Sequence, residues 1–392
     1  MKMLMKNANI IIPYEIKRNS SLVIEDGRIA NIFDGKSLNE NIYDLVIDVK
    51  GHFLSPGFID IHNHGGLGHD FMEGTYKALD SIADFHLKNG VTSLLATIMT
   101  EDINTIRKAI NGAKNYIENA GNSSKLKSQV LGIYLEGPYF ALEKKGGQPE
   151  KHIKKPDLEE IKELIKYADN HIKIVSLAPE LKGADDIIRY LRKEGILVSA
   201  GHTNATLEEA KNAIELGVTQ ATHLYNGMRA FNHREPGVIG AVLTDDRVIC
   251  EIICDGIHNH FLSLDLAVKL KGMDKVILIS DSMMAAGMKD GKYLLGGQDV
   301  FMKDGEARLV DGALAGSTHS LNKAVYNMIK NGIVPLEDAV KMASLNPAKA
   351  IGLDDVKGSI EIGKDADLII FDENVNIIGV MVKGKYNMDN VL

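Results

Sequence analysis

The feature that most constrains the fold is an alternation of short apolar runs with amphipathic stretches through the middle of the chain. Helical periodicity separates the apolar runs, for example at residues 157–168 and 206–216. Near-continuous apolar strands that alternate with helices are typical of a parallel sheet covered on both faces. Eight such units predict an α/β protein built on a closed (β/α)8 TIM-type barrel. The predicted strands span residues 57–62, 91–97, 129–136, 172–177, 196–202, 218–223, 247–255 and 276–281.

Both ends of the chain follow a different pattern. Residues 1–56 contain short β-rich runs, two of which are separated by Asp26-Gly27, a typical hairpin turn. Short strands and turns return near residue 357, and a further β-rich insertion falls at 292–313. We expect residues 1–56 and 357–392 to form one small β-sandwich domain, beside a catalytic barrel of residues 57–356.

Charge and composition exclude several classes of protein. The formal net charge is −8 and the basic residues are scattered, which argues against nucleic acid or anionic membrane as a partner. No apolar run approaches the ~20 residues that span a bilayer, and the first residues lack the features of a signal peptide. Cys250 and Cys254 lie four residues apart in one apolar run, as reduced core thiols do. We expect a cytoplasmic protein.

Polar residues recur where the predicted strands end. In a (β/α)8 barrel these ends converge on one face, where active sites are built. Imidazoles and carboxylates buried there without partners would be costly, and a metal ion removes that cost. His62 and His64 also share one face of an extended chain. The residues at the strand ends are His62, Glu136, His202, His223, Asp255 and Asp281.

This pattern predicts a catalytic metal centre. Three or more nitrogen and oxygen ligands with an open position are typical of catalytic sites, and zinc, iron, manganese or cobalt would all fit. Asp281 in "LISDSM" has two interpretations. It could cap a helix, or it could act as a general base that takes a proton from a metal-activated water. Its place after the eighth strand favours the general base.

The motifs resemble a known family. "PGFIDIHNHG", followed by a glutamate, two spaced histidines and a final aspartate, resembles the amidohydrolase superfamily. Finer motifs resemble N-acetylglucosamine-6-phosphate deacetylases between residues 26 and 372, namely "YLEGPYF", "GHTNAT", "THLYNGM", "HREPGVIGA", "ICDGIH", "SDSMMAAG" and "ALAGSTHSL". This resemblance implies a hydrolase that removes the acetyl group from N-acetylglucosamine 6-phosphate to give glucosamine 6-phosphate and acetate.

The resemblance also implies a role for each matching residue of the metal centre. Glu136, His202 and His223 match the shared metal ligands. His62 and His64 match the extra pair of members that hold two ions, with Glu136 bridging them. One or two divalent ions are therefore expected per subunit. Asp281 matches the catalytic acid and base.

Further matches concern the substrate, a small phosphorylated amino sugar. Arg234 matches a phosphate-binding arginine that in the family reaches in from the neighbouring subunit, so a homodimer is expected; the alternative is a solvated surface charge. Some members carry a histidine in place of Gln148, which leaves open which group stabilises the oxyanion. His233 is a candidate accessory phosphate contact. The other matches to substrate contacts are Gly147, Gln148, Asn226, Gly227, His258, Ala313, Leu314, Ala315 and Gly316.

Three alternatives remain at this stage. A deacetylase for N-acetylgalactosamine 6-phosphate differs by one hydroxyl orientation, which the sequence does not reveal. Dihydroorotase-like enzymes often use a carbamylated lysine, whereas the third predicted strand ends in Glu136 with no lysine beside it. A non-catalytic scaffold barrel would be expected to have lost ligands that are all present here. Six other histidines, at 69, 86, 152, 171, 260 and 319, are expected at the surface or in packing.

Overall fold

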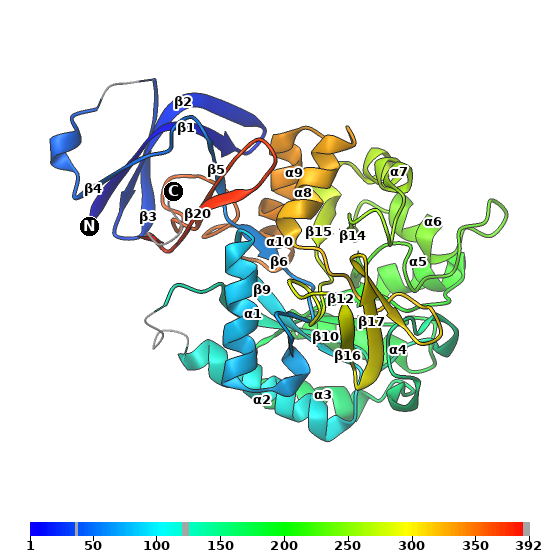
Figure 1. The fold of residues 1–392 in the computed structure, drawn as a ribbon. Helices are drawn as coiled ribbons and strands as arrows, with labels where there is room; N and C mark the ends of the chain where they lie inside the picture. Colours follow the sequence, from blue (N-terminus) through cyan, green and yellow to red (C-terminus); the bar gives the residue numbers. More distant parts are fainter. Residues whose placement is uncertain (36–37, 120–124, 387–392) are drawn as a thin grey trace.

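A computed structural model describes residues 1–35, 38–119 and 125–386 of the chain. Figure 1 shows a parallel sheet surrounded by helices, with the strands from both chain ends gathered to one side. Among the residues that the structure describes, no helix combines the length and apolar character needed to cross a membrane.

Eight parallel strands form the central sheet, and every predicted apolar run overlaps one of them. Each strand pairs with its sequence neighbour in this sheet. Beyond the two outer strands, the backbone N–H of Asp281 donates to the carbonyl oxygen of His62 at 3.0 Å. The first and last strands therefore meet, which is consistent with the predicted barrel. The strands are β6 (Phe58–Asp60), β9 (Val91–Met99), β10 (Gln129–Glu136), β11 (Ile172–Leu177), β12 (Leu197–Ala200), β13 (Val218–Ala221), β14 (Ile249–Ile253) and β15 (Val276–Ile279).

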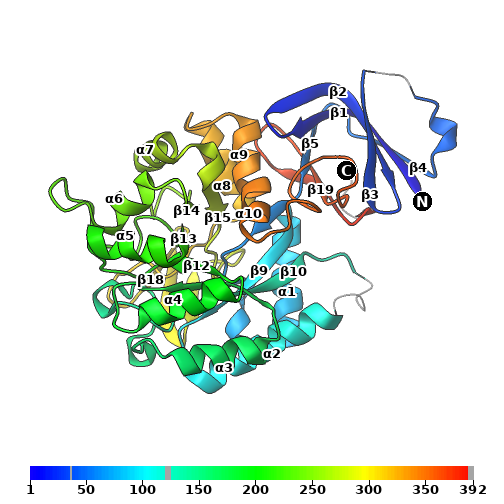
Figure 2. The same cartoon turned by 180° about the vertical axis from the view of Figure 1, so that it is seen from behind.

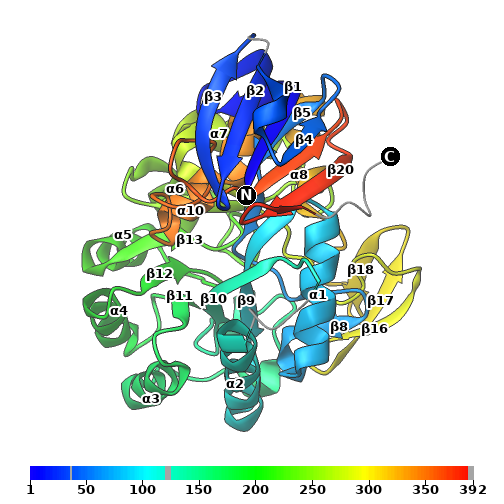
Figure 3. The ribbon, with the colours of Figure 1, turned by 90° about the vertical axis from the view of Figure 1, so that its left-hand side faces the viewer.

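Helices cover the outer face of this sheet, as Figure 3 shows for α1 to α5. Two of them begin where the sequence provides a cap. Asp157 accepts hydrogen bonds from two N–H groups at the start of α3, and Thr206 forms a capping box with Glu209 at the start of α5. The helices are α1 (Tyr76–Lys88), α2 (Ile103–Asn119), α3 (Leu158–Ala168), α4 (Ala184–Lys193), α5 (Leu207–Leu216), α6 (Gly237–Thr244), α7 (Phe261–Lys271), α8 (Leu321–Lys330), α9 (Leu336–Ala343) and α10 (Leu345–Ala350).

The strands have apolar side chains on both faces, as a sheet buried on both sides requires. In β9, Leu94, Ala96 and Ile98 join the large core between sheet and helices, while Leu95 joins a separate inner core. Tyr134 of β10 belongs to that inner core, and its ring centroid lies 4.5 Å from that of His62. The inner core thus supports the residues at the strand ends.

The two ends of the chain meet in a second sheet, seen from behind in Figure 2. Its strands are β1 (Lys2–Ile12), β2 (Glu15–Glu25), β3 (Arg28–Asp34), β4 (Leu45–Asp48), β5 (Phe53–Pro56), β19 (Leu368–Phe371), β20 (Ile377–Val382) and β21 (Lys385–Tyr386). The predicted hairpin at Asp26-Gly27 joins β2 to β3, and β5 pairs antiparallel with β19. Hydrogen bonds join all eight strands into one sheet rather than the two sheets of a sandwich. The length of β1 explains this, because β4 and β5 pair with different parts of it.

The predicted β-rich insertion is a three-stranded antiparallel sheet of β16 (Gly291–Leu295), β17 (Gln298–Lys303) and β18 (Glu306–Leu309). A two-stranded ribbon of β7 (Gly65–Gly66) and β8 (His69–Asp70) follows β6. One cavity is lined by residues in or near these two elements, including His64 before β7, Leu295 at the end of β16 and Leu314 after β18. These elements therefore help to enclose the space beyond the strand ends.

Candidate metal centre

The predicted site residues lie at the carboxyl ends of the parallel strands. Glu136 is the last residue of β10, and four others lie two residues beyond a strand, namely His62, His202, His223 and Asp281. His202, His223 and Asp281 have φ angles of 45°, 30° and 48°. Such left-handed backbone costs about 1–3 kcal/mol per residue and gathers at functional sites. The chain thus bends sharply just where these side chains are needed.

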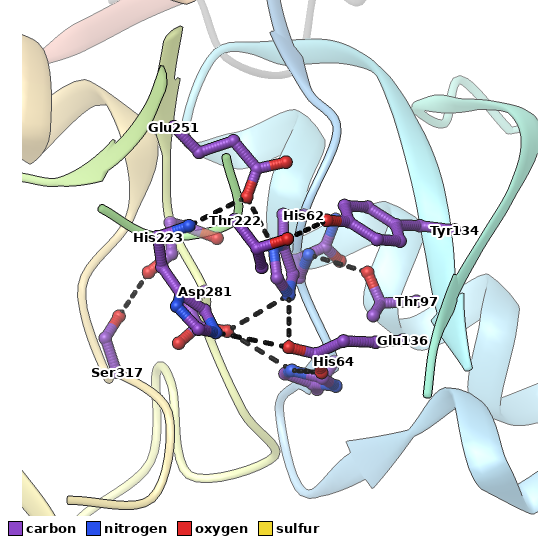
Figure 4. A network of polar contacts seen from close by, with 12 residues as sticks. His62, His64, Thr97, Tyr134, Glu136, Thr222, His223, Glu251, Asp281 and Ser317 are labelled. Carbon is purple, nitrogen blue, oxygen red and sulfur yellow. Dashed lines mark hydrogen bonds and ion pairs between the residues drawn. The ribbon is translucent and has the colours of Figure 1, made fainter. Parts of the chain in front are cut away.

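Two groups of possible ligands share the Glu136 carboxylate (Figure 4). The first group contains His62, His64 and Glu136. The second contains Glu136, His202 and His223. Within each group the nitrogen and oxygen atoms lie within 4.8 Å of one another.

The distances place Glu136 between the groups. Its Oε1 lies 3.3 Å from Nε2 of both His202 and His223, and 3.4 Å from Nε2 of His62. Its Oε2 lies 3.4 Å from Nε2 of His64. One carboxylate therefore faces four imidazoles, as a bridging ligand of two ions would.

The donor atoms fit a cation at this centre. Among the described residues, the buried Nε2 of His62 and Oδ1 of Asp281 have no hydrogen-bond partner. They lie 3.6 Å apart, and Asp281 Oδ1 is 3.2 Å from Nε2 of His64. Buried polar atoms that face one another in this way require a proton or a metal ion between them. Imidazole and carboxylate donors suit a divalent transition metal.

The pKa directions agree with a site that favours positive charge. Burial alone would lower the pKa of His64 and His223, but the Asp281 and Glu136 carboxylates outweigh it and raise both. Burial would raise the pKa of Glu136, yet its histidine partners hold it well below the usual range. Burial would also raise the pKa of Asp281, but the ion-pair contact of its Oδ1 with His64 and the charges of nearby histidines outweigh burial and lower that pKa. Asp281 is therefore favoured in its ionised, carboxylate form.

Groups behind the ligands orient the imidazole rings. Nδ1 of His202 contacts the Lys144 carbonyl oxygen at 2.8 Å, and Nδ1 of His223 contacts the Asn226 carbonyl oxygen at 3.0 Å. In both rings this leaves Nε2 to face Glu136. Such outer contacts set the tautomer and direction of metal-binding histidines.

The sequence analysis missed Glu251, which contacts His62 Nδ1 at 2.9 Å through its Oε2. Glu251 is fully buried in the middle of β14. The signal was present in "RVICEIICD", where one acidic residue interrupts an apolar strand. A buried carboxylate needs a partner, and that requirement alone marks Glu251 as notable.

A cavity of about 200 Å³ opens beside the ligand groups. Asp281, Glu136, His64, His202 and His223 lie in its wall. Eight of the predicted substrate residues also line it, namely Gly147, Gln148, Asn226, Gly227, His258, Ala313, Leu314 and Gly316. Residues that lie far apart in the sequence are thereby brought together around one space.

Two predicted substrate residues do not line this cavity. The side chain of Ala315 is buried, and its N–H donates to the Ala307 carbonyl oxygen at 3.0 Å. Arg234 lies in an exposed loop, where its guanidinium contacts the ring of His233 at 3.0 Å. Within this chain, neither side chain reaches the ligand groups.

Gln148 and His258 are held in place by named partners. The Gln148 carboxamide donates to Glu136 Oε2 at 2.8 Å and accepts from the Thr100 N–H at 3.1 Å. His258 Nδ1 contacts Asp255 Oδ2 at 2.6 Å, so Asp255 orients a cavity-lining ring rather than lining the cavity. Gln148 thus contacts a metal-ligand residue, which sequence reasoning did not anticipate.

The histidines assigned to the surface or to packing lie away from the ligand groups. His86 of α1 is buried, and its Nδ1 lies 3.7 Å from Oδ2 of Asp60 in β6. His260 caps α7. The others contact acidic residues or lie partly buried, namely His69, His152, His171 and His319.

Comparison with known proteins defines the class. Residues 53–386 match the amidohydrolase family, and the chain belongs to that family. It is 39% identical to N-acetylglucosamine-6-phosphate deacetylase of Bacillus subtilis, with 97% of this chain and 96% of the relative covered. It is 38% identical to N-acetylgalactosamine-6-phosphate deacetylase of Escherichia coli O157:H7, with 93% of each covered.

A solved structure gives the same result. A mutant N-acetyl-D-glucosamine-6-phosphate deacetylase from Mycobacterium smegmatis, in complex with N-acetyl-D-glucosamine-6-phosphate, superposes with a TM-score of 0.92. It is 30% identical, and all of both chains is covered. The resemblance inferred from the sequence motifs is confirmed.

Proposed function

We propose that this protein is a metal-dependent deacetylase that hydrolyses N-acetylglucosamine 6-phosphate to glucosamine 6-phosphate and acetate. One observation carries the chemistry: Glu136 links two histidine pairs at a cavity where the Asp281 carboxylate has an unpartnered oxygen. The named relatives support the choice of sugar.

The ligand groups would hold one or two divalent ions, of zinc, iron, manganese or cobalt. A metal ion here would supply Lewis acidity, which activates water and polarises the acetamide carbonyl. Glu136 and the histidines would hold it. His62 and His64, with Glu136, would hold a second ion. The Gln148 carboxamide already contacts Glu136 and the Thr100 N–H, so it is not free to donate to the oxyanion.

Asp281 performs the proton transfers in this proposal. Its Oδ1 accepts a proton from the attacking water, and its position next to the cavity allows it to return that proton to the departing amine nitrogen. Burial excludes bulk water from the carboxylate, whose side chain is 9% exposed. The same group therefore acts first as base and then as acid.

The sugar is positioned by groups at the cavity wall. Asn226, Gly227 and His258 are proposed to contact the phosphate and sugar hydroxyls, together with Gly147, Gln148 and the segment from Ala313 to Gly316. Arg234 suits a bidentate contact with phosphate oxygens. Since Arg234 does not line the cavity of its own chain, we assign its phosphate contact to the neighbouring subunit of a homodimer.

An exposed apolar stripe supports the homodimer. Leu262, Leu266 and Leu270 follow one another at intervals of four on α7 and are 60%, 53% and 61% exposed. Phe231, three residues before Arg234, is 58% exposed. Side chains of this kind in contiguous positions mark interaction surfaces. A second copy of the chain would cover them and bring Arg234 toward a partner cavity.

The domain division and location complete the proposal. Residues 1–56 and 357–392, of which 36–37 and 387–392 lie outside the described residues, are proposed to form a small β domain, because their sheet has its own apolar core centred on β1 and β19. Residues 57–356 would be the catalytic barrel. A cytoplasmic location is proposed because Cys250 and Cys254 are both free and the substrate class is a sugar phosphate.

The test is an assay for released primary amine on purified, metal-quantified protein. It compares N-acetylglucosamine 6-phosphate, N-acetylgalactosamine 6-phosphate and unphosphorylated N-acetylglucosamine. We expect a strong preference for the phosphorylated glucose form. Preference for the galactose form would instead favour a deacetylase for N-acetylgalactosamine 6-phosphate, the activity that names the Escherichia coli relative. No amine from any of them, with metal bound, would refute the proposed substrate class.

A further inference from the structure

We propose that Glu251 is a positioning residue that prepares the His62 and His64 group to hold its own metal ion. This inference rests on the metal centre of the proposed function. It concerns a residue that neither binds the ion directly nor lines the cavity among the described residues.

Glu251 is buried in β14 and uses both of its carboxylate oxygens. Oε2 accepts from Nδ1 of His62 at 2.9 Å and from the backbone N–H of His223 at 3.2 Å. Oε1 accepts from the carboxamide of Gln220. Figure 4 shows Glu251 next to both His62 and His223. A buried carboxylate costs several kcal/mol unless donors surround it. These three contacts offset that cost for Glu251, and two of them come from histidines of the candidate metal centre.

The contact with Glu251 determines which nitrogen of His62 can bind metal. A carboxylate oxygen offers only lone pairs, so the proton of neutral His62 must be on Nδ1. Nε2 then carries a lone pair directed at the centre, 3.4 Å from Glu136 Oε1 and 3.6 Å from Asp281 Oδ1. Without Glu251, the proton could move to Nε2 and block the metal position.

The dependence on Glu251 is specific to one ligand group. The rings of His202 and His223 are oriented by the backbone carbonyls of Lys144 and Asn226, and Glu251 contacts His223 only at its backbone N–H. In the first group, Nδ1 of His64 is buried without a partner among the described residues. Orientation of that group therefore falls mainly on the Glu251 contact with His62.

Gln220 makes a conservative substitution informative. Its Oε1 is buried without a hydrogen-bond partner among the described residues, so the amide group can turn over at little cost. In Glu251→Gln, the new carboxamide oxygen could still accept from His62 while its NH2 donates to Gln220. This variant removes the negative charge and preserves shape, whereas Glu251→Leu removes both the charge and the hydrogen bonds.

The experiment measures metal binding rather than turnover. Metal-free wild type, Glu251→Gln, Glu251→Leu and His62→Asn are dialysed against buffered Co²⁺ and Zn²⁺, and bound equivalents are counted by elemental analysis. Glu160→Gln is the matched control, since Glu160 accepts from Tyr139 and Lys154 and contacts no ligand residue. Circular dichroism checks that each variant is folded. If Glu251→Leu does not fold, the metal binding of Glu251→Gln alone tests the inference.

We expect two equivalents in wild type and in the control. In Glu251→Leu, one equivalent should bind about 10–100-fold more weakly, as removal of an outer partner of a metal ligand usually causes. In Glu251→Gln, which keeps an acceptor for His62 Nδ1 but loses the negative charge, the same equivalent should weaken by a smaller factor. The other equivalent should keep its affinity, as in His62→Asn. Unchanged binding of both ions in the Glu251 variants, or a single saturable ion in wild type, would overturn the inference. No metal in wild type would instead refute the proposed function itself.

Discussion

The substitution Asp281→Asn tests the proposed chemistry most directly, because it removes a proton acceptor and little else. Asp281 has a φ of 48°, which aspartate and asparagine tolerate better than most residues. Its N–H donates to the His62 carbonyl oxygen at 3.0 Å, and its carbonyl accepts from the Ser317 N–H at 2.7 Å. These bonds involve backbone atoms and survive the substitution, so the fold should be retained.

The expected loss of rate follows from the lining of the cavity. Among the lining residues that the structure describes, Asp281 and Glu136 are the carboxylates. Glu136 is engaged by four imidazoles and Gln148, so it has no free oxygen to replace the base. A general acid–base group contributes about 10²–10⁴ in rate, and we expect the upper end, since one residue serves both steps. A loss of about 10⁴ corresponds to about 5.4 kcal/mol of transition-state stabilisation.

The assay follows amine release at several substrate concentrations and determines metal content on the same preparation. We expect kcat to fall by about 10³–10⁴, with KM and metal content close to wild type. Activity within tenfold of wild type at full metal content would refute the role of Asp281 as base. Loss of metal would assign Asp281 to ion binding instead. Asp281→Ala is a useful comparison, because alanine at this φ should also lower the melting temperature.

Three further outcomes can be measured independently. Removal of metal with a chelator should lower the melting temperature in calorimetry, because an ion at about 100 times its Kd stabilises the fold by about 2.7 kcal/mol; an unchanged melting temperature would contradict the buried centre. Arg234→Ala should raise KM for the phosphorylated sugar by about 10–100-fold and leave KM for the unphosphorylated sugar unchanged. The free energy of unfolding in urea should also stay unchanged. Equal effects on both sugars would exclude a phosphate contact. Gly201→Ala should lower the free energy of unfolding in urea by about 1–3 kcal/mol and reduce metal content. The reason is that a Cβ at this position, next to His202, would collide with the hydroxyls of Ser176 and Thr222. Normal metal content would show that the loop adapts.

Much of the scaffold was predictable from periodicity. Each of the eight apolar runs overlaps a parallel strand, and the predicted helical stretches 157–168 and 206–216 begin at the residues that cap α3 and α5. The strand-end rule predicts His62, His202 and Asp281 on one face, and the structure has each of them two residues beyond a strand. This success has a local cause, because side-chain alternation and capping depend on a few neighbouring residues.

Other features were decided by contacts between distant segments. The expected sandwich is one hydrogen-bonded sheet, because β1 is long enough to pair with both β4 and β5. Gln148 contacts Glu136 across 12 residues of sequence, and its resemblance-based role did not reveal that contact. Arg234 lies apart from the cavity of its own chain, which no local pattern could indicate.

By itself, the sequence determined which residue types stand at the strand ends and on which face of each strand they lie. The tertiary structure decided how these residues combine. It set Glu136 between two histidine pairs, left one oxygen of Asp281 unpartnered, and placed Glu251 behind His62 across 189 residues of sequence. The physical reason is that strand periodicity depends on neighbouring residues, whereas the direction of a lone pair or the tautomer of a ring depends on whatever the closed fold packs against it.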